Sequence, residues 1–254
     1  MTTYKHSGTA GDTIYSLAAV KAMGGGDFLI AIGNLAHELE LRGYHSQHID
    51  PAHAGRYTVK DFEMLAPLIQ RQPYINSVVS WYPDNAAADI DLDKYRDVLY
   101  RTFEGNIVEA YFRTLDLPFD DNLQSMTWLE ADAERVAPIV VNVTPRYRTQ
   151  PSSDANFKAM AVDAVLDKNA VFVGTLQEHQ DFVELTGVAI PYRPVKDYLE
   201  MANIIAGADL FLGNQSLAYS IAVGLGKDCV LDIHKLKPQY LSECYFNRSN
   251  IQYI

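Results

Sequence analysis

The segment Gly8-Thr9-Ala10-Gly11-Asp12 near the N-terminus has the residue types of a ligand-binding turn. Its two glycines allow the backbone to approach a ligand closely. The helix expected to follow would offer free backbone N–H groups to an anion or a hydroxyl. The segment is neither a Walker A loop nor a Gly-x-Gly-x-x-Gly turn. The alternative interpretation is that Asp12 only caps the start of that helix.

A second segment, Thr144-Pro145-Arg146-Tyr147-Arg148, follows the strand expected over residues 139–143. Arginines hold diphosphates through bidentate hydrogen bonds, and this pair stands out in a chain whose net charge is −11. We interpret Thr144, Arg146 and Arg148 as anion-binding residues. The alternative interpretation is a solvated surface loop.

Two further segments follow expected strands in the second half of the chain. In the segment from Gly174 to His179, Glu178 could accept hydrogen bonds from ribose hydroxyls. The alternative is that Glu178 is only a first-turn carboxylate that interacts favourably with the helix dipole. In Gly213-Asn214-Gln215-Ser216, two amides and a hydroxyl before a helix form a cradle for a phosphate or a sugar. The alternative is an ordinary helix that is capped by Ser216 or Asn214.

Metal and hydrolase chemistry are not expected from this sequence. Asp89-Ile90-Asp91 and Asp91-Leu92-Asp93 look like metal-binding Asp-x-Asp pairs, but no apolar strand leads into the polar stretch 85–94. We therefore interpret them as a solvated charge run on a surface excursion. No Gly-x-Ser-x-Gly elbow is present. Four histidines lack the spacing of a zinc-binding helix, namely His37, His45, His48 and His53.

Helical and strand periodicities alternate along the chain. Apolar spacing predicts helices over residues 12–23, 59–70, 106–115, 156–166, 177–186, 197–206 and 216–225. Strands are expected over residues 28–32, 44–49, 75–81, 139–143, 170–173, 210–212 and 229–233, of which the apolar run 28–32 indicates a buried strand. Such alternation is typical of parallel sheets with helices on both faces. We expect two Rossmann-like α/β domains, residues 1–135 and 136–254, and we leave open a return of the C-terminal tail to the first domain.

Composition limits the partners and the compartment. A net charge of −11 repels nucleic-acid backbones on average, although a basic face around Arg96, Arg101 and Arg113 could offset this locally. Two cysteines without metal-site spacing fit a reducing compartment. The N-terminus has no apolar signal core, and no stretch approaches the roughly 20 apolar residues that span a bilayer. We therefore expect a cytoplasmic protein, whose oligomeric state stays open.

Together these segments resemble the heptosyltransferase-type branch of the GT-B glycosyltransferases. Residues 11–22 resemble that family's opening Gly-Asp-(Val/Ile)-(Leu/Ile)-x-x-Leu-Pro-Ala motif, and residues 201–216 resemble its Ile-x-x-Ala-Asp-x-x-(Ile/Val)-x-x-Asp-(Ser/Thr)-Gly signature. The stretch Gly174 to His179 is similar to the family's Gly-x-x-x-Glu-His. The likeness is good over residues 6–32 and 139–232 and loose over residues 33–138. Residues 62–75 and 244–254 also look similar to uncharacterised glycosyltransferase-like proteins of bacteriophages.

The resemblance implies two Rossmann-like domains that face a cleft, and a glycosyltransferase that takes its sugar from a nucleotide-sugar without a metal or other cofactor. It implies that Asp12 is the general base for the acceptor and that Gly8, Thr9 and Gly11 form the acceptor-side loop. The implied donor-binding residues are Thr144, Arg146, Arg148, Gly174, Glu178, Asn214, Gln215 and Ser216. The acceptor is left open between a glycan, a protein, a small molecule and a modified nucleobase.

The sequence departs from the family at one motif. The family's Asp-(Ser/Thr)-Gly-x-x-His is replaced by the stretch from Gln215 to Ser220, so its acidic residue and its histidine are both missing. Tyr219 is among the changed residues. One alternative is therefore a non-catalytic nucleotide or nucleotide-sugar binding protein of the same fold. A sugar-nucleotide epimerase is a further alternative, for which the acidic and histidine residues of the cleft are not evident.

Overall fold

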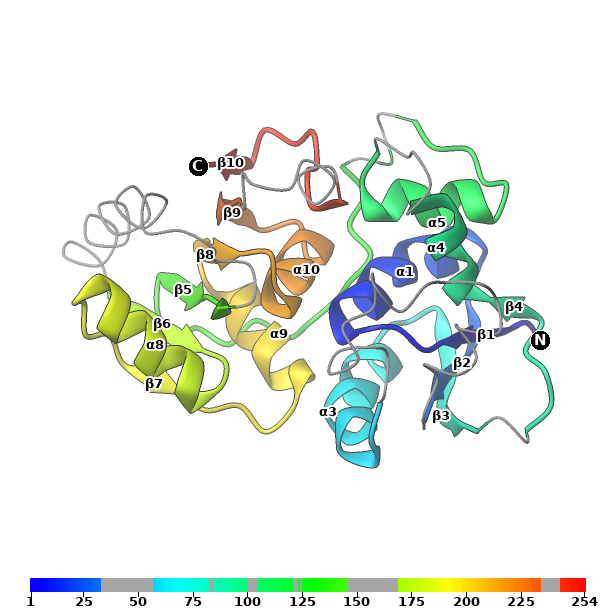
Figure 1. Cartoon of the computed structure of the whole chain (residues 1–254), viewed down its shortest axis with the longest axis horizontal. Helices are drawn as coiled ribbons and strands as arrows, with labels where there is room; N and C mark the ends of the chain where they lie inside the picture. The colour runs from blue at the N-terminus through cyan, green and yellow to red at the C-terminus, as the bar shows by residue number, and fades with distance from the viewer. Residues whose placement is uncertain are drawn as a thin grey trace.

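The computed structural model of the 254-residue chain describes residues 1–32, 57–82, 85–99, 105–120, 123, 125–145, 169–233 and 243–254. Within these ranges the chain forms two separate parallel sheets, one from each half of the sequence (Figure 1). The expected α/β class with two parallel sheets is confirmed. No helix in the described ranges is long and apolar enough to cross a membrane.

The first sheet has the strand order β3-β2-β1-β4. Its strands are β1 (Thr3–His6), β2 (Gly26–Ala31), β3 (Ile75–Trp81) and β4 (Ile90–Asp91). The helices of this half are α1 (Ala10–Ala22), α3 (Val59–Gln70), the short 3-10 helix η2 (Leu92–Lys94), α4 (Tyr95–Leu99) and α5 (Ile107–Thr114). The chain runs outward from β1 to β3 and then returns to the other side of β1 to form β4. The order of strands therefore reverses between β1 and β4.

The second sheet has the strand order β10-β9-β8-β5-β6-β7. Its strands are β5 (Ile139–Asn142), β6 (Ala170–Val173), β7 (Tyr192–Arg193), β8 (Leu210–Asn214), β9 (Asp228–Asp232) and β10 (Ile251–Tyr253). Its helices are α8 (Leu176–Thr186), α9 (Tyr198–Gly207) and α10 (Leu217–Gly224). Here the order of strands reverses between β5 and β8. Ligands of open α/β sheets bind beyond the carboxyl ends of the strands at such reversals.

Helix α1 is buried along most of its length. All eight residues from Thr13 to Val20 are buried, so every face of the helix at these positions lies in the interior. Its N-cap is Thr9, whose side chain accepts the backbone N–H of Asp12 at 3.5 Å. The helix thus begins two residues before the predicted start. Asp12 lies in its first turn and does not cap it.

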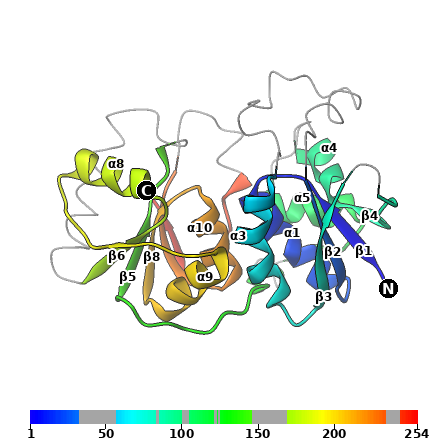
Figure 2. The same ribbon diagram turned by 90° about the horizontal axis from the view of Figure 1, so that it is seen from below.

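Helices from both halves fill the space between the two sheets. Helix α1 packs against α10, and α3 packs against α9 (Figure 2). The chain segment before β5 also takes part in this contact. The backbone N–H groups of Trp128 and Leu129 donate to the carbonyl of Gly224 in α10, at 2.9 and 3.0 Å. One hydrophobic core therefore contains side chains of both halves.

The C-terminal residues contact both halves. Strand β10 pairs in parallel with β9, so it belongs to the second sheet. Just before it, the ring of Phe246 stacks on that of Tyr15 in α1, with 5.7 Å between the ring centroids. Arg248 donates to the carbonyls of Val223 and Met126 at 2.9 and 2.8 Å. The domain limits at residues 135 and 136 stay a prediction.

Most predicted elements within the described ranges are present with small shifts of their ends, and α3, β3 and β6 have the predicted bounds. The predicted strand 44–49 and helix 156–166 lie outside the described residues. The prediction that residues 85–94 form a surface excursion is wrong for the last residues of this stretch, because β4 pairs with β1 there and η2 follows β4. Leu92 and Asp93 are buried as a result.

Candidate functional site

The reversal between β1 and β4 is held together by Asp93, whose side chain is buried just beyond β4. Strand β1 ends at His6 and β4 ends at Asp91, side by side and parallel. Asp93 accepts the backbone N–H of Ser7 at 3.0 Å and its hydroxyl at 2.5 Å. The side chain of Asp91 in turn accepts the backbone N–H of Asp93 at 3.1 Å. The ends of the two strands are thereby tied to each other.

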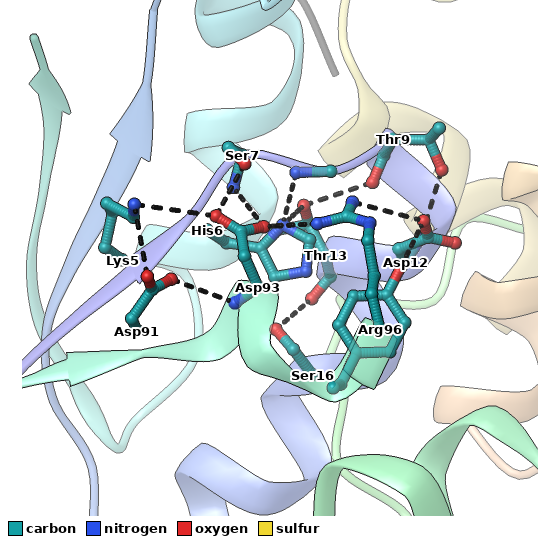
Figure 3. A network of polar contacts seen from close by, with 12 residues as sticks. Lys5, His6, Ser7, Thr9, Asp12, Thr13, Ser16, Asp91, Asp93 and Arg96 are labelled. Atoms are coloured by element: carbon teal, nitrogen blue, oxygen red, sulfur yellow. Dashed lines mark hydrogen bonds and ion pairs between the residues drawn. The ribbon is translucent and has the colours of Figure 1, made fainter. Parts of the chain in front are cut away.

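Two buried cations balance this carboxylate (Figure 3). The Arg96 guanidinium donates through Nη1 to Asp93 Oδ1 at 2.7 Å. Lys5 Nζ lies 3.5 Å from Asp91 Oδ2 and 3.7 Å from Asp93 Oδ2. Burial alone would raise the pKa of Asp93, but Arg96, His6, the Ser7 hydroxyl and Lys5 outweigh it and hold that pKa well below its usual range. Asp93 is therefore a permanent anion inside the protein.

Two predictions are wrong at this point. The Asp-x-Asp stretch was predicted to be a solvated charge run, but Asp93 is only 5% exposed. The physical reason is that β4 docks beside β1 and carries the following turn into the protein. Arg96 does not belong to a basic face, because it is buried against Asp93. Arg113 is exposed and pairs with Glu109 at 2.8 Å, and Arg101 lies outside the described residues.

The carboxylate of Asp12 lies at the edge of this buried cluster and is partly exposed. Tyr95 donates its hydroxyl to Asp12 Oδ2 at 2.7 Å, and Arg96 Nη2 lies 3.9 Å from the same oxygen. The Asp12 side chain keeps 25% of its surface open to solvent. The predicted general base is thus a carboxylate that is held through Oδ2 and is partly exposed.

A stack of aromatic rings supports this arrangement. The Tyr95 ring lies 4.3 Å from that of Tyr111 and 6.0 Å from that of His6, measured between centroids. The Tyr111 hydroxyl donates to the backbone carbonyl of Asp12 at 3.1 Å. Tyr111 comes from α5 and Tyr95 from α4. The helices that follow β4 therefore position the first turn of α1.

His6 is completely buried behind these rings. Its Nδ1 accepts the backbone N–H of Gly8 at 2.8 Å, so the proton of the neutral ring resides on Nε2, which lies 2.6 Å from the Tyr111 hydroxyl oxygen. Gly8 is required here, because a Cβ at this position would collide with the His6 ring and with Arg96 Nη2. The predicted acceptor-side glycine thus makes room for the buried cluster.

Burial of His6 makes stability depend on pH. Desolvation lowers the pKa of His6 from 6.5 to about 4, so between these values the unfolded chain binds a proton that the folded chain does not. The stability that the neutral His6 contributes to the folded state is therefore complete above pH 6.5 and is lost as the pH falls to about 4. We expect His6 to remove about 3 kcal/mol from the free energy of unfolding over this range. Urea titrations at pH 7, 5.5 and 4 measure the free energy of unfolding. If this free energy fell equally with pH in His6→Asn, the assignment to His6 would be contradicted.

The reversal in the second sheet is tied together by Asn214. This residue ends β8 beside β5 and is completely buried. Its Oδ1 accepts the backbone N–H of Thr144 at 3.0 Å, and its Nδ2 donates to the carbonyl of Thr144 at 2.7 Å. The Asn214 amide, which was predicted to bind the donor, is therefore hydrogen-bonded to the backbone of Thr144, the first residue of the segment that contains Arg146 and Arg148. Arg146 and Arg148 themselves lie outside the described residues.

The other residues predicted on this side lie at helix starts. Thr175 caps α8, and Glu178 Oε2 accepts both its backbone N–H at 2.8 Å and its hydroxyl at 3.0 Å. Glu178 thus has the helix-capping role, and a ribose contact stays a prediction. Gly174 has φ +142° and faces Asn142 and Glu178. Ser216 caps α10 by accepting the backbone N–H of Tyr219 at 3.3 Å, and Gln215 beside it is partly buried.

The helices that follow β1 and β8 begin next to each other. Helix α1 starts after β1 and α10 starts after β8, both at the carboxyl ends of their sheets. Their first turns meet, since a Cβ on Gly11 would lie 3.8 Å from Leu217 Cα and from Ser220 Oγ. Tyr219 points elsewhere, because its buried hydroxyl donates to the carbonyl of Cys244 at 3.0 Å. The segments of Asp12 and Ser216, far apart in the sequence, are thus adjacent.

Comparisons with known proteins establish the fold. No family model and no curated protein matches the sequence. The crystal structure of a family 9 glycosyl transferase from Veillonella parvula DSM 2008 matches with a TM-score of 0.63 and 11% identity, covering 99% of this chain and 84% of that one. The ADP-heptose LPS heptosyltransferase II of E. coli matches with a TM-score of 0.53 and 10% identity, and the match covers 100% of this chain and 90% of that one. The chain has the heptosyltransferase-type GT-B fold.

A third structure with the heptosyltransferase-type fold is the iron-containing dodecameric glycosyltransferase TibC of enterotoxigenic E. coli H10407. It has a TM-score of 0.51 and 13% identity, and the match covers 99% of this chain and 61% of that one. The predicted resemblance is thus confirmed at the level of the fold. Within the described ranges, no group of three or more His, Cys, Asp or Glu residues could hold a metal ion.

The sequence did not reveal the roles of the residues that contact Asp12, namely Tyr95, Arg96 and Tyr111, nor that of Asp93, which pairs with Arg96. One signal was present, because Asp93 and Arg96 have the i, i+3 spacing of a helical ion pair. The aromatic residues gave no comparable signal, since apolar spacing in α5 predicts a core face equally well. The strand end that these aromatic side chains support is set by the strand order of the sheet, which residue spacing does not show.

Proposed function

We propose that this protein is a glycosyltransferase that moves a sugar from a nucleotide-sugar donor to an acceptor. The observation that carries the proposal is the carboxylate of Asp12, which is fixed through Oδ2 and partly exposed at the strand reversal of the first sheet. A base in this place can take a proton from a hydroxyl that lies within hydrogen-bond reach. The heptosyltransferase-type fold supports the same assignment.

The donor would occupy the strand reversal of the second sheet. The start of α10, capped by Ser216, offers backbone N–H groups and the positive end of its dipole to a diphosphate. Asn214 anchors Thr144, from which Arg146 and Arg148 follow directly in the sequence. We assign the two arginines to the diphosphate, whose growing negative charge they would stabilise as the sugar leaves.

In the proposed step, the acceptor oxygen forms a bond to the anomeric carbon of the sugar. The bond from that carbon to the diphosphate breaks, and its electron pair leaves with the diphosphate. The acceptor proton passes to Asp12. In this proposal the arginines and the start of α10 take the charge-stabilising role, so no metal is assigned to the step.

The name of the E. coli neighbour makes ADP-sugars the first donors to test, since that protein acts with ADP-heptose. We expect an ADP-sugar at about 100 times its Kd to raise the free energy of unfolding by about 2.7 kcal/mol, which is a rise in Tm of about 5 °C or more for a chain of this size. UDP-, GDP- and CMP-sugars are tested in parallel by thermal denaturation. The absence of a shift with all four nucleotide classes would overturn the proposal.

A non-catalytic nucleotide-sugar binding protein is the second candidate. It is favoured by the stretch from Gln215 to Ser220, which lacks the acidic residue and the histidine of the motif that it resembles. Both candidates predict a thermal shift, but only the enzyme releases nucleoside diphosphate. Incubation of the stabilising donor with pools of glycan, protein, small-molecule and nucleobase acceptors therefore separates the two.

A further inference from the structure

We propose that Tyr95 and Arg96 are positioning residues that fix the Asp12 carboxylate by one oxygen and so direct the other oxygen toward the acceptor. This inference rests on the proposed function, because it assigns roles around the proposed base. Among the described residues, the side-chain contacts of the Asp12 carboxylate both involve Oδ2, one with Tyr95 and one with Arg96. Both of these contacts are to one oxygen, and the Asp12 side chain as a whole keeps 25% of its surface open to solvent.

Tyr95 provides the direct contact. Its side chain is completely buried, and its hydroxyl lies 2.7 Å from Asp12 Oδ2. The ring stacks on that of Tyr111 at 4.3 Å and lies 6.0 Å from that of His6, measured between centroids, and the Arg96 guanidinium lies 4.8 Å from its centroid. A ring packed on several sides holds its hydroxyl in one place. The hydrogen bond therefore sets the direction of the Asp12 side chain as well as its position.

Arg96 connects this contact to the buried anion. It donates through Nη1 to Asp93, and its Nη2 extends toward Asp12 Oδ2, as Figure 3 shows. Asp93 is in turn held by the backbone and the hydroxyl of Ser7. The space that Nη2 occupies is open only because residue 8 is glycine. The guanidinium thus has a fixed partner on one side and Asp12 on the other.

Such fixation matters because a side chain on the first turn of a helix otherwise samples several rotamers. A general base works only when its lone pair lies within hydrogen-bond reach of the proton that it takes. A displacement of about 1 Å can cost about 100-fold in rate. The loss of the positioning contact should therefore reduce turnover while leaving donor binding on the second sheet unchanged.

The test is Tyr95→Phe, which removes the hydroxyl and keeps the packed ring. We expect kcat to fall by about 10- to 100-fold, with the donor KM unchanged. The matched control is Tyr74→Phe, whose hydroxyl donates to the carbonyl of Trp128 at 2.6 Å and does not contact Asp12. The control removes a hydrogen bond of similar length and should leave kcat and KM at their wild-type values. An equal fall of kcat in both variants would show a merely structural role.

Crystal structures of the wild type and of Tyr95→Phe test the same inference without activity. We expect Asp12 to occupy one rotamer in the wild type and several, or another one, in the variant. An unchanged Asp12 side chain in the variant would overturn the positioning role, whatever the rates. If no donor is turned over by the wild type, the proposed function fails, while the two structures still decide whether Tyr95 holds Asp12.

Arg96→Lys provides a second, independent variant. A lysine keeps the charge, but its single nitrogen cannot contact Asp93 and extend toward Asp12 together. We expect the same loss of kcat and the same release of Asp12 as in Tyr95→Phe. Wild-type kcat together with an unmoved Asp12 would remove Arg96 from the proposal, and Tyr95→Phe decides the question if Arg96→Lys does not fold.

Discussion

The variant Asp12→Asn is expected to transfer sugar about 100- to 10,000-fold more slowly than the wild type, which is the usual contribution of a general base. The amide has the size of the carboxylate and can still accept the Tyr95 hydroxyl, but it cannot take a proton from the acceptor. Donor affinity should remain nearly unchanged, because the proposed donor site lies on the second sheet. Release of nucleoside diphosphate measures the rate, and calorimetric titration with the donor measures the affinity.

Asp97→Asn is the matched control for this prediction. Asp97 is an exposed carboxylate on α4, two residues beyond Tyr95, so its loss changes the net charge equally without touching the site. Transfer at the wild-type rate in Asp12→Asn would show that the base is assigned wrongly. A loss of donor affinity equal to the loss of rate would instead place Asp12 in donor binding.

Asp93→Asn is expected to have the largest effect on stability. The substitution leaves Arg96 buried opposite a neutral amide, and the removal of one partner of a buried pair costs about 3–5 kcal/mol. For a protein of this size the loss corresponds to a fall in Tm of about 10 °C. Urea denaturation at pH 7 measures the free energy of unfolding, and the fall in Tm checks it.

Asp209→Asn is the control for the buried pair. Asp209 accepts both terminal nitrogens of Arg135, but the two side chains are 68% and 53% exposed. An exposed pair contributes only about 0–1 kcal/mol, so this variant should be close to the wild type. A similarly small loss in Asp93→Asn would mean that the cluster around Asp93 does not anchor the first sheet.

The fold could be predicted well from the sequence because its helices and strands carry clear periodicity. Helix α3 and strand β3 have a regular apolar pattern and were predicted with their observed bounds. Strand β4 has only two residues, one of them an aspartate, and so presents no pattern at all. Its place beside β1 follows from strand order, which local periodicity does not contain.

The candidate site was predicted in part. The segments after β1 and β8 could be found because glycine, amide and hydroxyl residues before a helix have a recognisable function. Asn214 can hold the backbone of Thr144 only because β5 and β8 are neighbours in the sheet. The residue spacing within either segment does not reveal this pairing. In the same way, Asp93 looks like any acidic residue of a polar stretch until β4 is placed next to β1.

The packing of α1 links folding to the proposed chemistry. The helix that carries Asp12 begins in the first half, yet its first turn meets α10, and Tyr15 stacks on the C-terminal Phe246. Part of the surface of this helix is therefore buried against the second half, and another part against α5 of the first half. The two sheets are separate, but the helices between them share one hydrophobic core. The residues that contact the Asp12 carboxylate belong to the first half, while the second half packs against the helix that carries it, so the proposed base and the proposed donor site share one structural support.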